Sequence, residues 1–211
     1  NNFDDDDNRR LKELSQSSGL GHYVLSPSSL WRDGKRYHLA SLSRYPFKKI
    51  HKFSGLAFEQ SAIMTLIDTP LGEVAICNLH LHSTSEDDRL KELDVTLNHV
   101  SEHEHRVLLG DFNSLSSDEN YDVASLELEA RFDLTDVLRQ DYVDIASRLG
   151  LDDRSTSPTP MNINPKISMP IRIDYIYVTR SLAASFTNAT VIKTQISDQA
   201  SDHYPFVAVT S

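Results

Sequence analysis

Several short segments of the chain place acidic, amide or imidazole side chains directly after apolar residues. After the apolar residues 107–109 and a glycine, Asp111 and Asn113 stand two positions apart, so their side chains can converge on one point. A carboxylate there can orient and deprotonate a water molecule, and an amide can hold a phosphoryl oxygen. The alternative interpretation is a simple turn, because Gly, Asp and Asn all favour turns.

A second polar pattern lies in residues 76–82. On a strand, Asn78, His80 and His82 would share one face, with Cys77 and Leu79 on the other. Two histidines at this spacing could bind zinc or could contact a phosphate. A half-exposed strand with a polar outer face is the alternative.

Two further pairs stand near the C-terminal end of the chain. Arg172 and Asp174 share one face of a strongly β-prone segment, where the alternative is a solvent-exposed ion pair worth less than about 1 kcal/mol. Asp202 stands beside His203 just before the last predicted strand, an arrangement suited to a metal ligand or to an acid/base pair. The alternative is a loop with ordinary polar residues.

Together, and in this order, these segments resemble the endonuclease/exonuclease/phosphatase superfamily. The resemblance covers about residues 10–210 and includes a strand and turn at residues 39–46. It implies a four-layer α/β sandwich in which two mainly antiparallel sheets are flanked by helices. It also implies a metal-dependent phosphodiesterase that uses Mg²⁺, with Mn²⁺ as the alternative, and a phosphoester substrate. That substrate is a nucleic acid, a phospholipid head group or a small phosphodiester.

The resemblance implies a role for each residue that matches a motif. Asp111 would orient and deprotonate the attacking water, and Asn113 would hold that water or a phosphate oxygen. His203 would contact the scissile phosphate, and Asp202 would orient His203 or bind the metal.

The remaining roles fall on the two strand segments. His80 would bind a non-bridging oxygen or assist the leaving group, and Asp174 would hold His80 in its working tautomer. Asn78 and Arg172 would bind substrate. The histidine of the 78–81 motif is similar to that of the deoxyribonuclease, sphingomyelinase and deadenylase branches.

Hydrophobic periodicity and turn residues predict the elements that position these side chains. The predicted helices are residues 8–18, 86–103, 120–129 and 136–149. The predicted strands are residues 22–26, 37–43, 48–53, 61–68, 73–81, 106–110, 172–179, 185–194 and 205–210. Residues 154–170 contain four prolines and predict an ordered loop or flap.

Composition is that of a soluble globular chain, with 39% hydrophobic and 25% charged residues. We expect one domain over residues 1–211. The formal net charge of −10 disfavours a non-specific nucleic-acid binder, although a basic stretch lies at residues 44–52. A single cysteine, Cys77, excludes an internal disulfide and favours a reducing, cytoplasmic setting. No P-loop, serine-hydrolase motif, signal peptide or membrane-spanning segment is recognisable.

The sequence departs from the family pattern at its start. The family's first two motifs, an Asn and a metal-binding Glu that each end a strand, are missing, so we expect a domain that is incomplete at its N-terminus. We therefore expect weak Mg²⁺ binding and low activity. A non-catalytic binding or scaffold domain is the second hypothesis. A zinc site on His80 and His82, near His99, His103 and His105, is the third.

Overall fold

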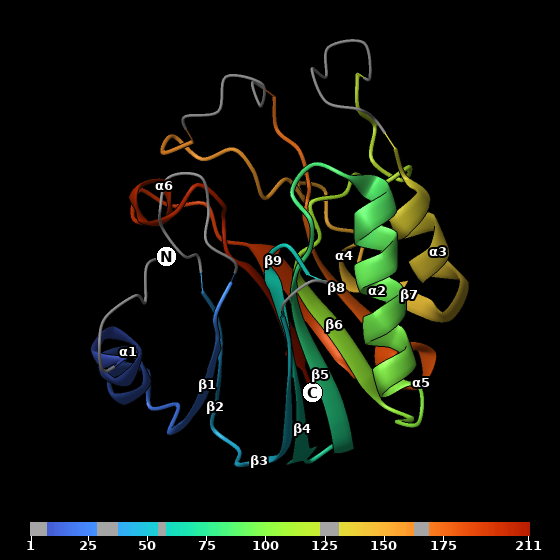
Figure 1. Ribbon diagram of the computed structural model, residues 1–211. Coiled ribbons are helices and arrows are strands. Elements are labelled where there is room, and N and C mark those ends of the chain that lie inside the picture. The colour runs from blue at the N-terminus through green and yellow to red at the C-terminus, as the bar shows by residue number, and fades with distance from the viewer. Residues whose placement is uncertain (1–7, 29–37, 55–57, 123–130, 163–168) are drawn as a thin grey trace. The chain divides into compact units, whose positions relative to one another are not determined.

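Two compact units make up the chain, which we call unit 1 (residues 1–110) and unit 2 (residues 111–211). A computed structural model describes residues 8–28, 38–54, 58–122, 131–162 and 169–211 (Figure 1). The acidic run at residues 1–7 lies outside the described residues.

Unit 1 contains two sheets. The first pairs β1 (His22–Ser26) with β2 (Leu39–Ser43) in antiparallel register. The second has the order β3-β4-β5-β6, formed by Phe47–Phe53, Ser61–Thr69, Gly72–His80 and Arg106–Asp111. Its first three strands are antiparallel neighbours, as the sequence predicts from their short turns. The helix α2 (Glu86–Val100) connects β5 to β6.

The layers of unit 1 follow from these pairings. Strand β2 contacts β4 and β5, so the two sheets lie face to face. Helix α1 (Arg9–Ser18) contacts β1 on the outside, and α2 covers the opposite face of the larger sheet (Figure 1). The order helix, sheet, sheet, helix confirms the predicted α/β sandwich.

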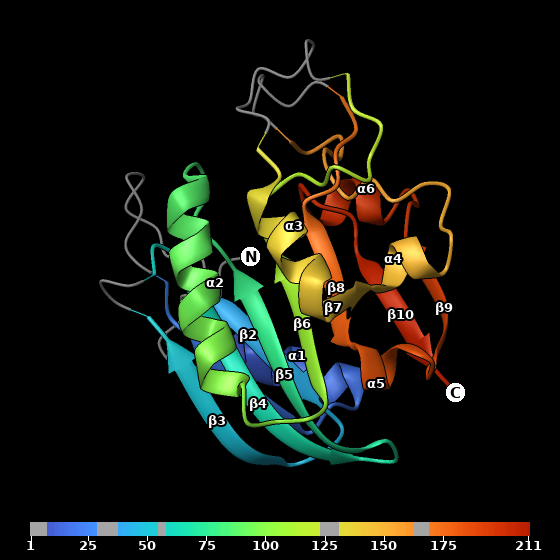
Figure 2. The same ribbon diagram turned by 90° about the vertical axis from the view of Figure 1, so that its right-hand side faces the viewer.

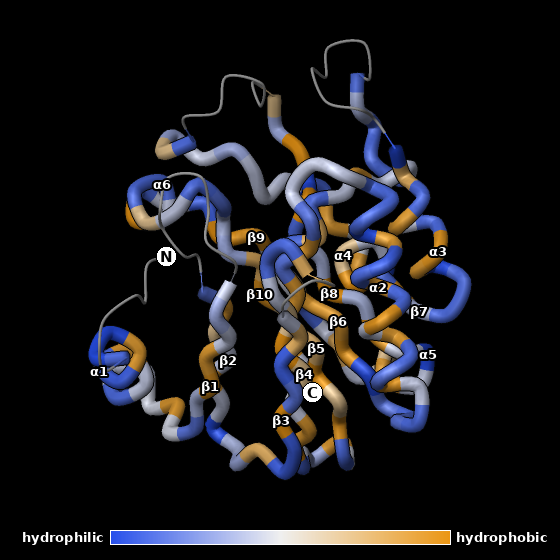
Figure 3. The backbone as a smooth tube through the Cα atoms, in the orientation of Figure 1, coloured by the Kyte–Doolittle hydropathy of each residue, from blue (hydrophilic) through white to orange (hydrophobic). Residues whose placement is uncertain are grey.

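The core of unit 1 explains why β4 and β5 are its central strands. Seven consecutive residues of β4, Ser61 to Ile67, are buried, which fits a strand covered on both faces. Figure 3 shows that hydrophobic residues are concentrated along the strands. Cys77 of β5 is fully buried, and this burial raises the pKa of its thiol to about 12, so the thiol is unreactive at neutral pH.

Helix α2 begins where its sequence predicts. The Ser85 side chain accepts a hydrogen bond from the Asp88 backbone N–H, and the first turn is acidic, which suits the positive end of the helix dipole. Leu93 and Val100 lie on the buried face. None of the helices in the described part of the chain is long and apolar enough to cross a membrane.

Unit 2 also combines paired strands with helices (Figure 2). Strand β7 (Tyr142–Asp144) pairs antiparallel with β8 (Asp174–Thr179), and β9 (Phe186–Val191) pairs antiparallel with β10 (Phe206–Thr210). Strand β10 also contacts β8, and helices pack on β7 and β8. These helices include α3 (Asp133–Asp141), α4 (Ile145–Arg148) and α5 (Arg180–Ala183), while α6 (Ser197–Ala200) precedes β10.

Most predicted elements agree with the structure to within a few residues, but the single helix predicted over residues 136–149 is wrong. Residues 142–144 form β7, which separates α3 from α4. The reason is local: Asp144 is extended, and its side chain caps α4 by accepting the Ala146 N–H. The helix predicted over 120–129 falls largely outside the described residues.

Gly110, the residue before Asp111, has a conformation that excludes a side chain. Its φ is +121°, and an added Cβ would lie 2.2 Å from the Leu79 carbonyl oxygen. Both facts require glycine, because L-residues avoid this φ and the obstructing atom belongs to the backbone of β5. The close approach of β6 to β5 therefore depends on this glycine.

We predict that Gly110→Ala lowers the free energy of unfolding by about 3 kcal/mol or more, measured by urea denaturation. Gly150→Ala is the matched control, because Gly150 also has a positive φ (+66°) but nothing lies within 4 Å of its added Cβ. The control should lose only about 1 kcal/mol. Equal losses in the two variants would show that the contact with Leu79 is unimportant.

Candidate catalytic site

Asp111 stands at the end of β6, where the backbone leaves the strand. The next residue, Phe112, donates its backbone N–H to the Ile173 carbonyl oxygen at 2.9 Å. The Asp111 carboxylate accepts the Asn113 N–H at 2.8 Å, and Asn113 has a φ of 50°. Asn tolerates this left-handed conformation and Asp favours such a turn, so the Asp–Asn spacing forms a tight turn as well as a functional pair.

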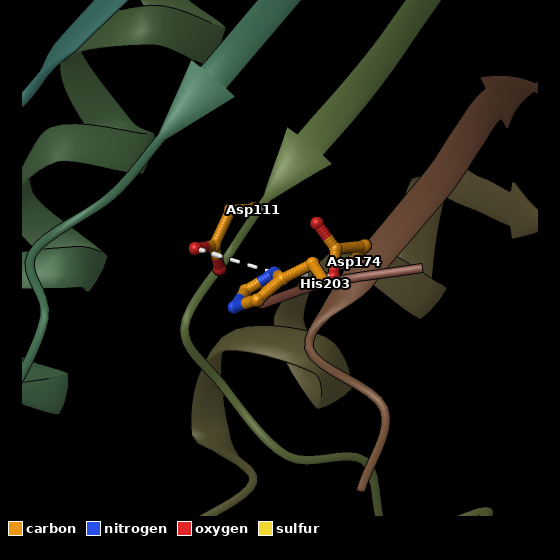
Figure 4. Close-up of side chains that lie close together, drawn as sticks. All are labelled: Asp111, Asp174 and His203. Atoms are coloured by element: carbon orange, nitrogen blue, oxygen red, sulfur yellow. Dashed lines mark hydrogen bonds and ion pairs between the residues drawn. The ribbon is translucent and has the colours of Figure 1, made fainter. Parts of the chain in front are cut away.

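Asp174 and His203 meet at the same place. Asp174 is the first residue of β8, and His203 lies in the loop between α6 and β10. The His203 Nδ1 is 2.9 Å from an Asp174 carboxylate oxygen and 4.0 Å from an Asp111 carboxylate oxygen. Figure 4 shows the three side chains converging from separate segments of the chain. Their ligand atoms all lie within 4.8 Å of one another, and no other such group occurs among the described residues.

The two carboxylates change the titration of His203. Burial by itself lowers the pKa of the imidazole, but the hydrogen bond to Asp174 and the charges of Asp174, Asp111 and Asp202 outweigh it. Together they raise the pKa of His203 to about 9. The ring is therefore a cation at neutral pH, with its Nδ1–H donated to Asp174.

Asp202 does not make the contact with His203 that the resemblance implies. Its side chain is exposed and accepts a hydrogen bond from the Ser201 hydroxyl at 3.3 Å, and the group that orients His203 is Asp174. The expected orienting role of Asp202 is therefore wrong, although its negative charge contributes to the raised pKa of His203. Its role as a metal ligand and the role of Asp174 toward His80 stay predictions.

Arg172 does not reach the surface, so its expected contact with substrate is wrong. Its side chain is 1% exposed and makes two hydrogen bonds to Asp144, at 2.6 and 2.8 Å. A third, at 3.2 Å, reaches Glu119. Burial favours the neutral guanidine, but the bonds with Asp144 raise the pKa of Arg172 above its usual value. The residue is therefore a buried structural cation next to the site.

Unit 1 holds the three other residues that the sequence singled out. Asn78 donates from its amide nitrogen to the Ala40 carbonyl oxygen at 2.9 Å, which ties β5 to β2. His80 ends β5. His82 Nδ1 accepts the backbone N–H groups of residues 84 and 85, so it holds a turn. The substrate-binding role of Asn78 and the catalytic role of His80 stay predictions.

Neither the zinc hypothesis nor the basic stretch gains support from the described residues. His99 stacks on His51 at 4.0 Å between ring centroids, and no histidine of unit 1 belongs to a three-ligand group there. Lys48 pairs with Asp68 and Glu73, at 3.1 and 2.6 Å. The charge of this lysine is thus balanced by acidic neighbours.

A divalent cation is compatible with the cluster. Mg²⁺ prefers oxygen ligands and keeps several waters, so one or two carboxylates are enough for the protein's share. The side chains of Asp111 and Asp174 are 18% and 19% exposed and offer such oxygens. A histidine ligand must be neutral, so metal binding at His203 would compete with protonation of the ring.

Comparisons with known proteins identify a family and a fold for this chain. The sequence profile described as "Endonuclease/Exonuclease/phosphatase family" matches residues 3–203. Among curated proteins, no match reaches significance. Three solved structures illustrate the likeness at the level of fold.

One is an endonuclease/exonuclease/phosphatase family protein from Leptotrichia buccalis, with a TM-score of 0.69 and 20% identity over 96% of this chain and 76% of that chain. A second, an endonuclease/exonuclease/phosphatase from Beutenbergia cavernae, has a TM-score of 0.69 and 22% identity over 94% and 55%. The third is the 3′ phosphatase NExo from Neisseria bound to product DNA hairpin, with a TM-score of 0.68 and 18% identity over 93% and 82%.

The raised pKa of His203 predicts a pH-dependent stability. Folding favours the charged imidazolium, so this stabilisation is fully present below about pH 6.5 and is lost as the pH rises through about 9. We expect a loss of about 2 to 3 kcal/mol in unfolding free energy, measured by urea denaturation with EDTA present. His203→Gln is the control, and its subtraction removes the titration of other groups. A chain whose pH dependence matches that of the variant would contradict the ion pair.

Because Arg172 is buried and paired, we predict that its substitution lowers the free energy of unfolding. Arg172→Met leaves Asp144 buried without its partner, so we expect a loss of about 3 to 5 kcal/mol in unfolding free energy. The double variant Arg172→Met/Asp144→Leu should recover a large part of this loss, because it removes both buried charges. Full stability of the single variant would contradict the structural role.

Proposed function

Because the chain belongs to the Endonuclease/Exonuclease/phosphatase family, a family of phosphoric ester hydrolases, we propose that it hydrolyses phosphodiester bonds by attack of a water that Asp111 orients. The observation that carries this proposal is the convergence of Asp111, Asp174 and His203. A phosphodiester anion repels nucleophiles. A site that cleaves it therefore needs a base for the water and positive charge for the phosphate.

Asp111 is the group that acts on water. One carboxylate oxygen is held by the Asn113 N–H at 2.8 Å, which fixes the direction of the other. That other oxygen lies 4.0 Å from the His203 ring, beyond a direct hydrogen bond. This oxygen is the one that would accept the proton of the attacking water. The amide of Asn113, on the same turn, would hold that water or a phosphate oxygen.

His203 supplies the positive charge. Its Nδ1–H is donated to Asp174, so Nε2 carries the second proton of the cation and is available as a donor to a phosphate oxygen. A charged donor that is already oriented stabilises the charge that builds up on the phosphate without further reorganisation. Asp174 maintains both the charge and the ring orientation.

We propose Mg²⁺ as the metal, with Mn²⁺ as the alternative. Asp174, which offers a carboxylate oxygen in the cluster, and Asp202, the ligand that the resemblance implies, would hold it together with water. The bound cation would neutralise negative charge on the phosphate. The protein's own part is to supply carboxylate oxygens and to keep His203 protonated beside them.

We propose a nucleic acid as the substrate to test first. The NExo structure is described as a 3′ phosphatase bound to product DNA hairpin, which supports a nucleic-acid substrate over a phospholipid head group. The formal net charge of −10 and the paired state of Lys48 argue against tight, non-specific binding to duplex DNA. A short or single-stranded substrate fits these observations better than a long duplex.

We predict that the chain hydrolyses bis(p-nitrophenyl) phosphate with Mg²⁺ and that EDTA abolishes this activity. Asp111→Asn and His203→Ala should each lower kcat by about 10²- to 10⁴-fold, because each removes a group that acts on the reacting atoms. The measurement is release of p-nitrophenolate under saturating substrate.

Asp141→Asn is the matched control for Asp111→Asn, because Asp141 is an exposed carboxylate at the end of α3. It should keep the activity of the unsubstituted chain. Comparison of 5′-labelled single-stranded DNA with p-nitrophenyl phosphorylcholine then separates the nucleic-acid and phospholipid classes. Absence of metal-dependent turnover with every substrate would favour a binding or scaffold domain.

A further inference from the structure

Thr156 belongs neither to the sequence motifs nor to the proposed reaction, yet it contacts the backbone at the site. Its side chain is fully buried, in the proline-rich stretch that the sequence predicts as a loop. Its hydroxyl oxygen accepts the backbone N–H of Ile173 at 3.3 Å and that of Asp174 at 3.2 Å. Its carbonyl oxygen accepts the backbone N–H of Tyr204 at 2.7 Å.

These contacts join the segments that carry the site. Asp174 stands at the first residue of β8, so the hydroxyl of Thr156 fixes the backbone from which the orienting carboxylate extends. Tyr204 directly follows His203, so the Thr156 carbonyl fixes the backbone of the loop that carries the imidazole. One residue therefore contacts both segments whose side chains form the bond of 2.9 Å between His203 and Asp174.

The neighbouring residues strengthen this connection on the side of the loop. Thr159 is 4% exposed, donates its hydroxyl to the Ser201 carbonyl oxygen at 2.5 Å and donates its N–H to the Asp202 carbonyl oxygen at 3.2 Å. Thr156 in turn donates its own N–H to the Ile171 carbonyl oxygen at 3.0 Å. The loop that carries His203 is thus held from residues 156–159 by backbone and hydroxyl contacts, and Thr156 alone among these residues also reaches Asp174.

We propose that Thr156 is a positioning residue of the catalytic site, which acts by holding the Asp174 and His203 segments at hydrogen-bonding distance. This inference rests on the proposed function for its kinetic consequence but not for its structural one. Groups that orient catalytic side chains typically change rates by about 10- to 100-fold when they are removed. A displacement of about 1 Å at a site is enough for a loss of that size.

The test compares three substitutions in the purified chain. Thr156→Val keeps the shape of the side chain but removes the acceptor for two N–H groups. Thr156→Ser keeps the hydroxyl. Thr156→Cys keeps a weak acceptor in a side chain of similar size, so it can replace the valine variant in the test if that variant unfolds. Thr96→Val is the matched control, because Thr96 is also fully buried but its hydroxyl bonds to Glu92 within α2 of unit 1.

Two readouts separate positioning from general stability. The first is hydrolysis of bis(p-nitrophenyl) phosphate with Mg²⁺, from which kcat and KM are determined. The second is the proton resonance of the His203 Nδ1–H in chain labelled with ¹⁵N-histidine, assigned by its absence in His203→Gln. This resonance reports the hydrogen bond to Asp174 directly and requires no turnover.

We expect Thr156→Val to lower kcat by about 10- to 100-fold with little change in KM, and to shift or broaden the His203 resonance. Thr156→Ser should restore both, Thr156→Cys should lie between, and Thr96→Val should change neither. An unchanged resonance in both Thr156→Val and Thr156→Cys would overturn the inference, even if kcat fell. If the unsubstituted chain shows no turnover, the proposed function fails, and the resonance alone decides whether Thr156 positions the pair.

Discussion

The hydrogen bond between His203 and Asp174 is the interaction on which the site depends. Burial works against it, because removing an imidazolium from water lowers the pKa of the ring. Only a carboxylate at 2.9 Å, supported by the charges of Asp111 and Asp202, keeps the ring charged. The chemistry of His203 is therefore set by distance, and the fold must hold that distance against the repulsion between neighbouring carboxylates.

Backbone contacts contribute to this control. Asp111, Asp174 and His203 are far apart in the chain, and each follows or begins an element whose backbone is fixed near the site. Phe112 donates to the Ile173 carbonyl oxygen, and Tyr204 donates to that of Thr156. The backbone also adopts unusual conformations here, at Gly110 and Asn113. Such geometry is maintained only where the surroundings enforce it.

The sequence predicted the fold and the order of most elements, and its candidate residues include the three side chains that meet in the cluster. These depend on local patterns: the periodicity of α2, the short turns between β3, β4 and β5, and the placement of Asp111, Asp174 and His203 at strand ends. The sequence did not predict β7, because a three-residue strand between two helical patterns has no periodicity of its own. Its existence depends on pairing with β8, which is 30 residues or so away in the chain.

The sequence did not predict which side chains pair with each other. Asp202 adjoins His203 in sequence and was expected to orient it or to bind the metal, but its side chain is exposed and bonds to Ser201, while Asp174 contacts the ring. Arg172 was expected to bind substrate because the resemblance implied that role. A buried arginine requires a buried carboxylate as its partner. Here that carboxylate is Asp144 of β7, a strand that the sequence did not predict. The two errors have one cause. The type and spacing of a residue indicate which bonds it can form, but contacts between segments that are distant in the chain determine its partner. The contacts of Thr156 are likewise not visible in the sequence, because its hydroxyl and carbonyl oxygens bind the backbone N–H groups of residues 173, 174 and 204, which are distant in the chain.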